Sequence, residues 1–477
     1  MVEHSNELKR GRQSSADGLA SPDPNSGVGH DPAKRGAIGL FSAINIVIAS
    51  MIGAGVYTTS GFALADLGSP ILVLLAWGIS GFLALCGAVS YGGLAQRFSE
   101  SGGEYLFLAR SIHPAAGYIA GFVSLLAGFT GAIAFAALTF EAYLMGMVAT
   151  GGDTSPLPAG VIASLTIIVA WLMHGFRVRA GTRFQDLLVV LKLAMLLAFL
   201  AFAGMSLGRP WEGMATAGQR PEGWMVIPAL AVSLTWISLS YCGFNAAIYI
   251  TEETQHGGKT VRDALIIGTL IVTTLYLLLN AVFVLAPPAS EVVGKEDVAA
   301  VAARYVGGAK LETLLRYVIL LSLATSVLSM MMTGPRVYAK MAEDGVLPGW
   351  FKFDAELPGR GVFAQGVLAV AVVSIATLRQ LLSYLGLTLS LCAALTVAAI
   401  FVLKRRGEPV EVIGYPWTPL AFVIGTLAIV LTAGTQRPIE LAVAAATLAV
   451  GWFAYQFSHP HRPHLGTESP RPRDQDA

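Results

Sequence analysis

The sequence has few charged residues and few cysteines for its length. Of its 477 residues only 13% are charged, about half the usual share in soluble globular proteins, and 55% are hydrophobic. This imbalance excludes a soluble enzyme, a disordered protein and a nucleic-acid-binding protein, and a formal net charge of +1 supplies no field that would attract phosphates. The three cysteines, Cys86, Cys242 and Cys392, lie in apolar stretches without paired spacing or a CxxC pattern. We therefore expect no disulfide framework, no metal site and no other cofactor.

Long apolar stretches take the place of the missing charge. A helix needs about 20 apolar residues to cross the hydrocarbon layer, because its backbone polar groups must all be satisfied within it. Twelve stretches are long enough for this interpretation. We place them at residues 39–61, 70–95, 114–147, 157–176, 184–207, 225–250, 261–287, 311–341, 363–378, 380–403, 416–434 and 438–457. The sequence thus predicts an all-α membrane protein with 12 transmembrane helices.

The distribution of basic residues predicts the orientation in the membrane. With the amino terminus inside, 22 basic residues lie in cytoplasmic segments and 8 outside, and with Lys192 inside a span they account for all 31. Both termini are therefore predicted to be cytoplasmic. Residues 1–35 and 458–477 are polar, and we expect two disordered tails. Since no targeting signal is visible, we expect the bilayer of a bacterial cytoplasmic (inner) membrane.

Two predicted spans carry small and polar residues at their middle. Residues 49–57 read Ala-Ser-Met-Ile-Gly-Ala-Gly-Val-Tyr, and residues 239–245 read Leu-Ser-Tyr-Cys-Gly-Phe-Asn. The two lie five spans apart, as in transporters whose inverted repeats place broken first and sixth helices together at the midplane. Close helix packing at Gly53 and Gly55 is the simpler alternative. Two interruptions in corresponding positions favour a binding site, and the free N–H and C=O groups of broken helices suit a zwitterion.

Several stretches, in this order and spacing, resemble the amino acid/polyamine/organocation transporter superfamily, the amino acid permeases with a LeuT-type fold. They are Gly-Ala-Gly-Val-Tyr at 53–57, Ser-Gly-Gly-Glu-Tyr at 101–105, Lys192, Gly-Phe-Asn at 243–245 followed by Glu252 and Glu253, and the stretch 335–348 with Asp-Gly-Val-Leu-Pro at its end. The resemblance covers residues 36–457. It implies a ten-helix core at 36–403, built as a 5+5 inverted repeat (36–207 and 225–403) with broken helices 1 and 6, and two additional helices in 404–457.

This resemblance also implies a substrate site at the two breaks. The substrate carboxylate would meet the backbone N–H groups of Ala54 and Gly55, and the substrate side chain would face Tyr241 and Phe244. The ammonium would meet the backbone carbonyl oxygens of Met51, Leu239, Ser240 and Cys242. The complete predicted set is Met51, Ile52, Gly53, Ala54, Gly55, Leu239, Ser240, Tyr241, Cys242, Gly243 and Phe244. Many relatives carry an aromatic gate where Leu239 stands, so the gate here is expected to be smaller and aliphatic.

Lys192 lies within the apolar fifth span, where an unpaired charge costs several kcal/mol. Snorkelling toward the membrane surface is the simpler explanation. The resemblance implies instead that its ammonium replaces the sodium ion of sodium-coupled relatives, bonding a carbonyl near Ile52 or Gly53 and the hydroxyl of Ser326 or Ser329. Sodium dependence is then not expected. A lysine that releases and regains a proton would suit proton coupling, and a permanently charged one would serve an exchanger equally well.

Three carboxylates near the ends of the spans are further candidates. Glu141, near the outer end of the third span, either guides a cationic substrate or is an interfacial carboxylate in contact with water. Asp186, at the start of the fifth span, is expected to pair with Arg183. Glu253 is expected to have a gating or structural role.

These observations predict a secondary active transporter that moves amino acids by alternating access, as a proton-coupled symporter or an exchanger. An enzyme is not expected, because no nucleophile, metal or acid–base set occurs at one depth. A transporter of cationic amino acids or polyamines is the alternative within the same fold. A sensor that binds an amino acid without moving it is the alternative from another class, although the polar tails are short for a soluble output domain. The substrate, the coupling ion and the oligomeric state stay open.

Overall fold

The computed structural model describes residues 38–100, 102–148, 158–175, 182–205, 221–345, 347–352 and 359–457. Both predicted tails, 1–35 and 458–477, lie outside these described residues. Within them the regular structure is helical, apart from an isolated parallel β-bridge between Ile38 and Thr254. Helices satisfy their own backbone hydrogen bonds, which is what an apolar solvent demands.

Ten helical segments of the described chain are long and apolar enough to cross a membrane. They are Leu40–Leu67, Pro70–Arg97, Pro114–Met147, Asp186–Met205, Gly223–Glu253, Gly258–Leu285, Val298–Met331, Leu378–Arg405, Trp417–Gln436 and Pro438–Phe457. Two shorter apolar helices, Val161–Met173 and Arg360–Ile375, stand where the fourth and ninth spans were predicted. The prediction of an all-α, multi-pass protein is confirmed, and the count of 12 stays a prediction.

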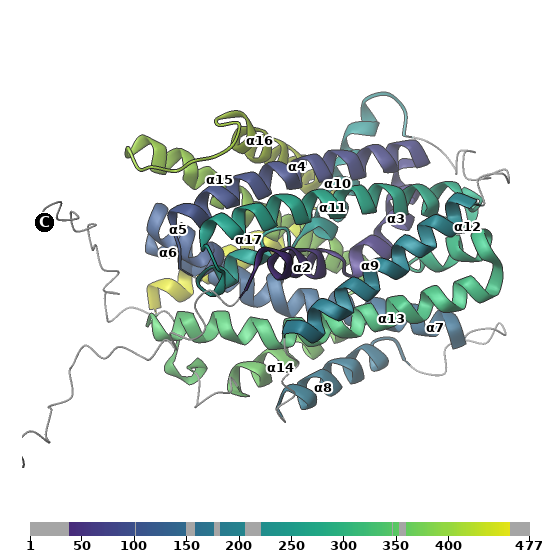
Figure 1. Cartoon of the computed structure of the whole chain (residues 1–477), viewed down its shortest axis with the longest axis horizontal. Coiled ribbons are helices and arrows are strands. Elements are labelled where there is room, and N and C mark those ends of the chain that lie inside the picture. Colours follow the sequence, from purple (N-terminus) through teal and green to yellow (C-terminus); the bar gives the residue numbers. More distant parts are fainter. Residues whose placement is uncertain are drawn as a thin grey trace, which may run out of the picture.

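The long helices α4 and α11 lie side by side along the long axis of the molecule, with α5 and α6 toward one end and α3 and α12 toward the other (Figure 1). In chain order the elements are α2 (Leu40–Met51), α3 (Ala54–Leu67), α4 (Pro70–Arg97), α5 (Gly103–Ser111), α6 (Pro114–Val123), the π-helix η2 (Ser124–Gly131), α7 (Ala132–Val148), α8 (Val161–Gly175), α9 (Thr182–Met205), η5 (Gly223–Met225), α10 (Val226–Tyr241), η6 (Ala246–Glu253), α11 (Gly258–Leu285), α12 (Ala289–Val292), α13 (Val298–Glu343), η7 (Gly349–Phe351), α14 (Gly359–Ile375), α15 (Leu378–Arg405), α16 (Trp417–Gln436) and α17 (Pro438–Phe457).

Local sequence signals explain several helix ends. Helix α4 begins with Pro70, whose missing N–H is not needed at a first helical position. Helix α15 begins with a capping box, in which the Thr377 hydroxyl accepts a hydrogen bond from the backbone N–H of Gln380 and the Gln380 side chain accepts one from the backbone N–H of Thr377. Its last turn carries Lys404 and Arg405, which complement the helix dipole.

The eighth span was predicted to start at residue 311. Helix α13 runs from Val298 to Glu343, but non-helical backbone angles at Gly307 and Gly308 divide it into two helices, and the second begins close to the predicted start. The first, shorter helix carries Arg304, which forms an ion pair with Glu312 across the kink.

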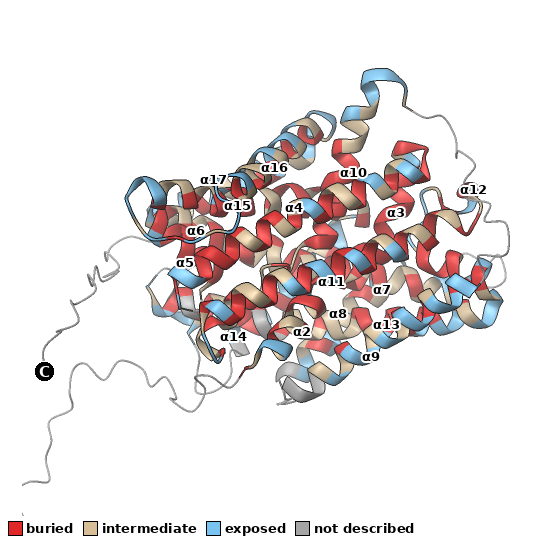
Figure 2. Ribbon diagram, turned by 45° about the horizontal axis from the view of Figure 1, so that its top comes forward, coloured by how far each residue is buried: buried red, intermediate tan, exposed pale blue. Residues whose placement is uncertain are grey.

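Buried residues line the inner faces of the helices, and exposed ones lie on the periphery and at the ends (Figure 2). Large apolar side chains stand among the exposed residues, such as Leu187 on α9 and Ile439 on α17. In water such surfaces would associate, but on a membrane protein they suit contact with lipid tails.

Candidate functional site

The first predicted break is present between α2 and α3. Helix α2 ends at Met51, Ile52 leaves the helical conformation with ψ 82°, and Gly53 is extended with φ −122° and ψ −152° before α3 begins at Ala54. The residue after the break, Gly55, approaches the sixth span closely, since a Cβ atom at this position would lie 2.9 Å from the Cα atom of Ser240. Glycine thus allows the two interrupted spans to touch.

The second break lies between α10 and η6. Helix α10 ends at Tyr241, and Gly243 follows with φ +103°, a conformation that side-chain-bearing residues rarely adopt. A Cβ atom at Gly243 would also lie 2.7 Å from the carbonyl oxygen of Ser50, at the end of α2. The Oγ atoms of Thr59 and Ser240 lie 3.3 Å apart, so the two breaks are in direct contact.

Tyr276 of α11 bridges the breaks, and sequence reasoning missed it. Its hydroxyl is the hydrogen-bond donor to two backbone carbonyl oxygens, that of Met51 at 2.5 Å and that of Ser240 at 3.1 Å. Asn280, one turn further along α11, donates to the carbonyl oxygen of Tyr276 and accepts a hydrogen bond from Ser60 of α3. The available signal was two polar residues four apart in an apolar span, which places them on one helix face.

Lys192 reaches the first break from α9. Its half-buried side chain donates a hydrogen bond to the backbone carbonyl oxygen of Ile52. The hydroxyl of Ser326, one of two predicted partners on α13, donates instead to the carbonyl oxygen of Ser322 at 2.9 Å. The lysine therefore contacts one of the carbonyl groups that the resemblance implied, at the position where α2 stops being helical.

The arrangement so far is two interrupted spans in contact, a tyrosine across their carbonyl groups and a lysine on one of them. Residues 38–455 match the model of the family described as amino acid permease. The chain belongs to this family. The family predicted from the motifs is thus confirmed, and with it a multi-pass membrane protein that transports amino acids and is not an enzyme.

Three human relatives illustrate how the permease compares with characterised proteins. The large neutral amino acids transporter small subunit 2 is 26% identical over 418 residues, which are 84% of this chain and 76% of the relative. The b(0,+)-type amino acid transporter 1 is 26% identical over 269 residues, 55% of this chain and 54% of the relative. The Asc-type amino acid transporter 1 is 25% identical over 389 residues, 78% and 72% of the two chains.

The predicted aromatic residues of the sixth span pack against neighbouring helices of the permease. The ring of Tyr241 lies against Trp77 and Tyr276, and its hydroxyl donates to the carbonyl oxygen of Trp77 at 3.1 Å. The ring of Phe244 stacks edge-on against Tyr91 and Phe422. Both side chains therefore support the second break by packing against neighbouring helices. The predicted gate residue Leu239 is 8% exposed.

Two acidic residues have partners that sequence reasoning did not anticipate. Glu141 accepts hydrogen bonds from the backbone N–H groups of Gly160 at 2.7 Å and Ala163 at 2.9 Å, at the start of α8. It thus fills the role of a cap for a helix whose first N–H groups lack intrahelical acceptors. Asp186 accepts from Ser42 at 2.7 Å and Asn45 at 3.2 Å on α2, while the side chain of its predicted partner, Arg183, lies outside the described residues.

Glu253 ends η6, and its main chain pairs with the segment before α2. The backbone N–H of Ile38 donates to the Glu253 carbonyl oxygen at 2.9 Å, and that of Gln255 donates to the Ile38 carbonyl oxygen at 3.0 Å. These bonds join the end of η6 to the segment that precedes α2. Among the described residues, no group of three or more His, Cys, Asp or Glu side chains is arranged to hold a metal ion.

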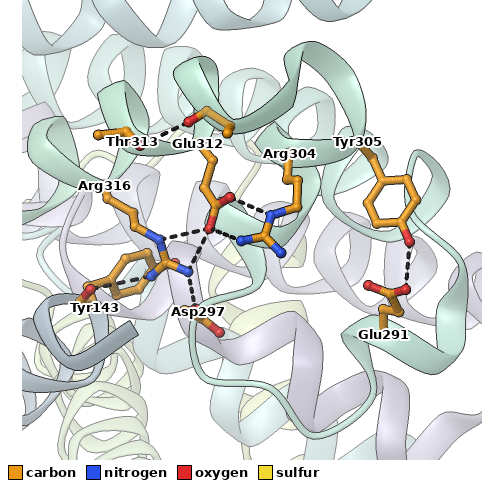
Figure 3. Close-up of polar contacts among 9 residues, drawn as sticks. Tyr143, Glu291, Asp297, Arg304, Tyr305, Glu312, Thr313 and Arg316 are labelled. Carbon is orange, nitrogen blue, oxygen red and sulfur yellow. Dashed lines mark hydrogen bonds and ion pairs between the residues drawn. The ribbon is translucent and has the colours of Figure 1, made fainter. Parts of the chain in front are cut away.

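A buried ion network joins α13 to α7, far along the chain from the predicted site. Arg316, with a side chain only 7% exposed, pairs with Asp297 at 2.6 Å and with Glu312 at 3.1 Å, and Arg304 pairs with Glu312 from the other side (Figure 3). These residues line a cavity of about 440 Å³. The guanidinium of Arg316 also donates to the carbonyl oxygen of Tyr143 on α7.

Tyr143 connects this network to α3, the second half of the first span. Its hydroxyl donates to the carbonyl oxygen of Tyr57 on α3 at 2.7 Å. The loop before α13 contacts α3 as well, since the backbone N–H of Gly294 donates to the carbonyl oxygen of Gly61 at 2.8 Å. Burial, with the negative charges of Asp297 and Glu141 nearby, raises the pKa of Glu296 in the same loop.

Proposed function

We propose that this permease is a secondary active transporter that moves amino acids by alternating access, as a proton-coupled symporter or an exchanger that does not use sodium. The observation that carries the proposal is the hydrogen bond from Lys192 to Ile52 at the break of the first span. A fixed or titrating ammonium at an unwound carbonyl supplies the positive charge that a coupling cation would otherwise bring.

The substrate is proposed to bind as a zwitterion between the two breaks. Ala54 and Gly55 open α3, so their N–H groups have no intrahelical acceptor and suit the carboxylate. The carbonyl groups of Met51 and Ser240 suit the ammonium, and both already receive the Tyr276 hydroxyl. The substrate therefore shares these acceptors with Tyr276.

The transporter architecture proposed here has 12 spans, with the short apolar helices Val161–Met173 and Arg360–Ile375 as the fourth and ninth. The core at 36–403 is proposed to be an inverted repeat of five and five helices, with two more in 404–457. The contact of the two breaks is consistent with such repeats, because they interrupt the first and the sixth spans. Both termini are proposed to be cytoplasmic, on the basis of the basic residues.

Neutral amino acids are the proposed substrate class. The human relative that aligns over 84% of this chain is a transporter subunit for large neutral amino acids. The carboxylate of Glu141, which would have to attract a cationic substrate, is occupied on both oxygens by backbone N–H groups of Gly160 and Ala163. This occupancy weighs against the alternative of cationic amino acids or polyamines.

Uptake of radiolabelled amino acids into proteoliposomes tests the proposal. Wild-type protein and Lys192→Ala are compared with and without an inward proton gradient, with and without internal amino acid, and in sodium-free buffer. Symport is supported if the gradient accelerates wild-type uptake and Lys192→Ala, while still binding substrate, loses that acceleration. Exchange is supported if uptake requires internal amino acid and ignores the gradient. Binding without uptake under every condition would instead support the sensor alternative.

A further inference from the structure

Glu104 is a buried carboxylate that the proposed transport mechanism does not use. It lies in the first turn of α5, within the Ser-Gly-Gly-Glu-Tyr stretch, and is only 7% exposed. Helix α5 is not one of the candidate spans, and it packs between α6 and α15. A buried ionisable group without an evident structural cation is a candidate for function.

Three hydrogen-bond donors from three other segments converge on this carboxylate. Tyr91 of α4 donates its hydroxyl to Oε1, and Asn245 donates its amide to the same oxygen at 3.1 Å. Cys392 of α15 donates its thiol to Oε2 at 3.1 Å. All three partners are uncharged, and all three present a hydrogen atom. This environment favours a carboxylate that accepts over a carboxylic acid that must itself donate.

Burial opposes the same charge that these donors stabilise. Burial raises the pKa of Glu104 above its ordinary value, and the hydrogen bonds from Tyr91, Cys392 and Asn245 limit the rise. Among the described residues, the other titratable groups close enough to interact with its charge are Cys242 and Tyr249. Thiols and phenols ordinarily ionise well above neutral pH. Glu104, with its raised pKa, is therefore the member of this cluster that gains a proton first as the pH falls.

Asn245 connects the carboxylate to the break of the sixth span. It lies between Gly243, with its φ of +103°, and the first residue of η6, Ala246. The inner half that follows is a 3₁₀ helix with a non-helical residue at Ile250, and such helices have poorer hydrogen-bond geometry than α-helices. A side-chain contact at Asn245, the residue that precedes this segment, therefore has a large share in fixing it.

We propose that Glu104 is a positioning residue for transport: its ionised carboxylate holds Asn245, and with it the inner half of the sixth span, against α4, α5 and α15, and proton uptake by Glu104 releases that half. A carboxylic acid has a hydrogen of its own to donate and accepts hydrogen bonds more weakly than a carboxylate, so protonation weakens the contact that holds Asn245. The proton comes from water and returns to water. The inference rests on the proposed transport function and adds a second proton site to that of Lys192.

Exchange of radiolabelled amino acid across proteoliposomes tests this inference, with equal pH on both sides and a series from about pH 5.5 to about pH 8.5. The variants are Glu104→Gln and Asn245→Asp. The matched control is Glu100→Gln, which removes a carboxylate four residues away that is 45% exposed and pairs with Arg110. It removes the same charge without touching the buried cluster.

Wild-type exchange is expected to accelerate as the pH falls through the pKa of Glu104. Glu104→Gln resembles the protonated form, so it is expected to keep the faster rate at every pH, whereas Glu100→Gln should follow the wild-type profile. Asn245→Asp places a second carboxylate beside Glu104 and is expected to shift the midpoint upward by about one pH unit. A role in packing alone would change the rate without moving the midpoint.

The inference is overturned if Glu104→Gln shows the wild-type pH profile. It is also overturned if the midpoint of Asn245→Asp is not shifted, and this second variant gives the answer if Glu104→Gln does not fold. Infrared difference spectra of the purified protein give a readout that needs no transport. On acidification, a protonated-carboxyl band should form in wild type and Glu100→Gln but not in Glu104→Gln, and the absence of this difference also overturns the inference. A wild type that shows the band but moves no amino acid contradicts the proposed function instead.

Discussion

The hydroxyl of Tyr276 donates a hydrogen bond to the backbone carbonyl oxygen of Met51 across 2.5 Å, which joins α11 to the end of α2. The same hydroxyl lies 3.1 Å from the carbonyl oxygen of Ser240. A single side chain thus holds two backbone carbonyl groups, one from each broken span, close to the same hydroxyl. Because the substrate ammonium is proposed to bind there, Tyr276 sets the geometry of the acceptors.

The variant Tyr276→Phe tests this relationship. The phenyl ring preserves the packing against Trp77 and Tyr241, and only the hydrogen bonds are lost. A net hydrogen bond contributes about 1 kcal/mol, so we expect substrate Kd to rise by about fivefold to tenfold. Equilibrium binding to the purified protein measures the change. Tyr317→Phe is the control, since Tyr317 is 59% exposed on α13, and equal affinities in the two variants would contradict the role of Tyr276.

Removing the charge of Glu141 is expected to weaken the fold and to leave selectivity unchanged. Glu141→Gln keeps one oxygen acceptor but loses the negative charge at the start of α8, which should reduce the free energy of unfolding by about 1 kcal/mol. Thermal unfolding in detergent measures the loss, with the exposed Glu222→Gln as control. Uptake of arginine relative to leucine is measured in parallel. A selective loss of arginine uptake would revive the cationic-substrate alternative.

The two helix breaks could be predicted because their cause is local. Glycines and polar residues in the middle of apolar spans are visible in the sequence, and the structure places interruptions at Gly53 and Gly243. Tyr276 could not be found in this way, because its partners are backbone carbonyl groups 225 and 36 residues away. Every residue has a backbone carbonyl group, so the sequence does not show which of them accepts a hydrogen bond from a distant side chain. The role of Glu141 as a helix cap was missed for the same reason, since its partners are backbone N–H groups of another helix.

The start of the eighth span could also be predicted, because its apolar run begins just after the kink at Gly307 and Gly308. The pairing of the nearby charges could not be predicted. The side chain of Arg304 is 64% exposed and pairs across the kink with Glu312, which is 8% exposed. The sequence shows such charges but not which of them are paired.

The ion network offers a direct comparison of a buried and an exposed arginine on one carboxylate. Arg316→Met leaves Glu312 and Asp297 without their buried partner, and removing one member of a buried pair typically costs about 3–5 kcal/mol. Arg304→Met removes the exposed partner of the same Glu312, and such pairs contribute less than about 1 kcal/mol. Unfolding in mixed detergent micelles compares the two variants. Equal losses would contradict the burial argument.

The close approach of the two broken spans predicts that Gly243 tolerates no side chain. In Gly243→Ala, a methyl group would lie 2.7 Å from the carbonyl oxygen of Ser50, and the φ of +103° adds a strain of about 1–3 kcal/mol. The variant can relieve the steric contact only by moving the two breaks apart. We therefore expect weaker substrate binding and a transport rate that falls at least about tenfold. Gly78→Ala in α4 is the control, because a methyl group there meets no atom within 4 Å and improves helix propensity. Wild-type uptake by Gly243→Ala would show that the proposed site does not depend on this contact.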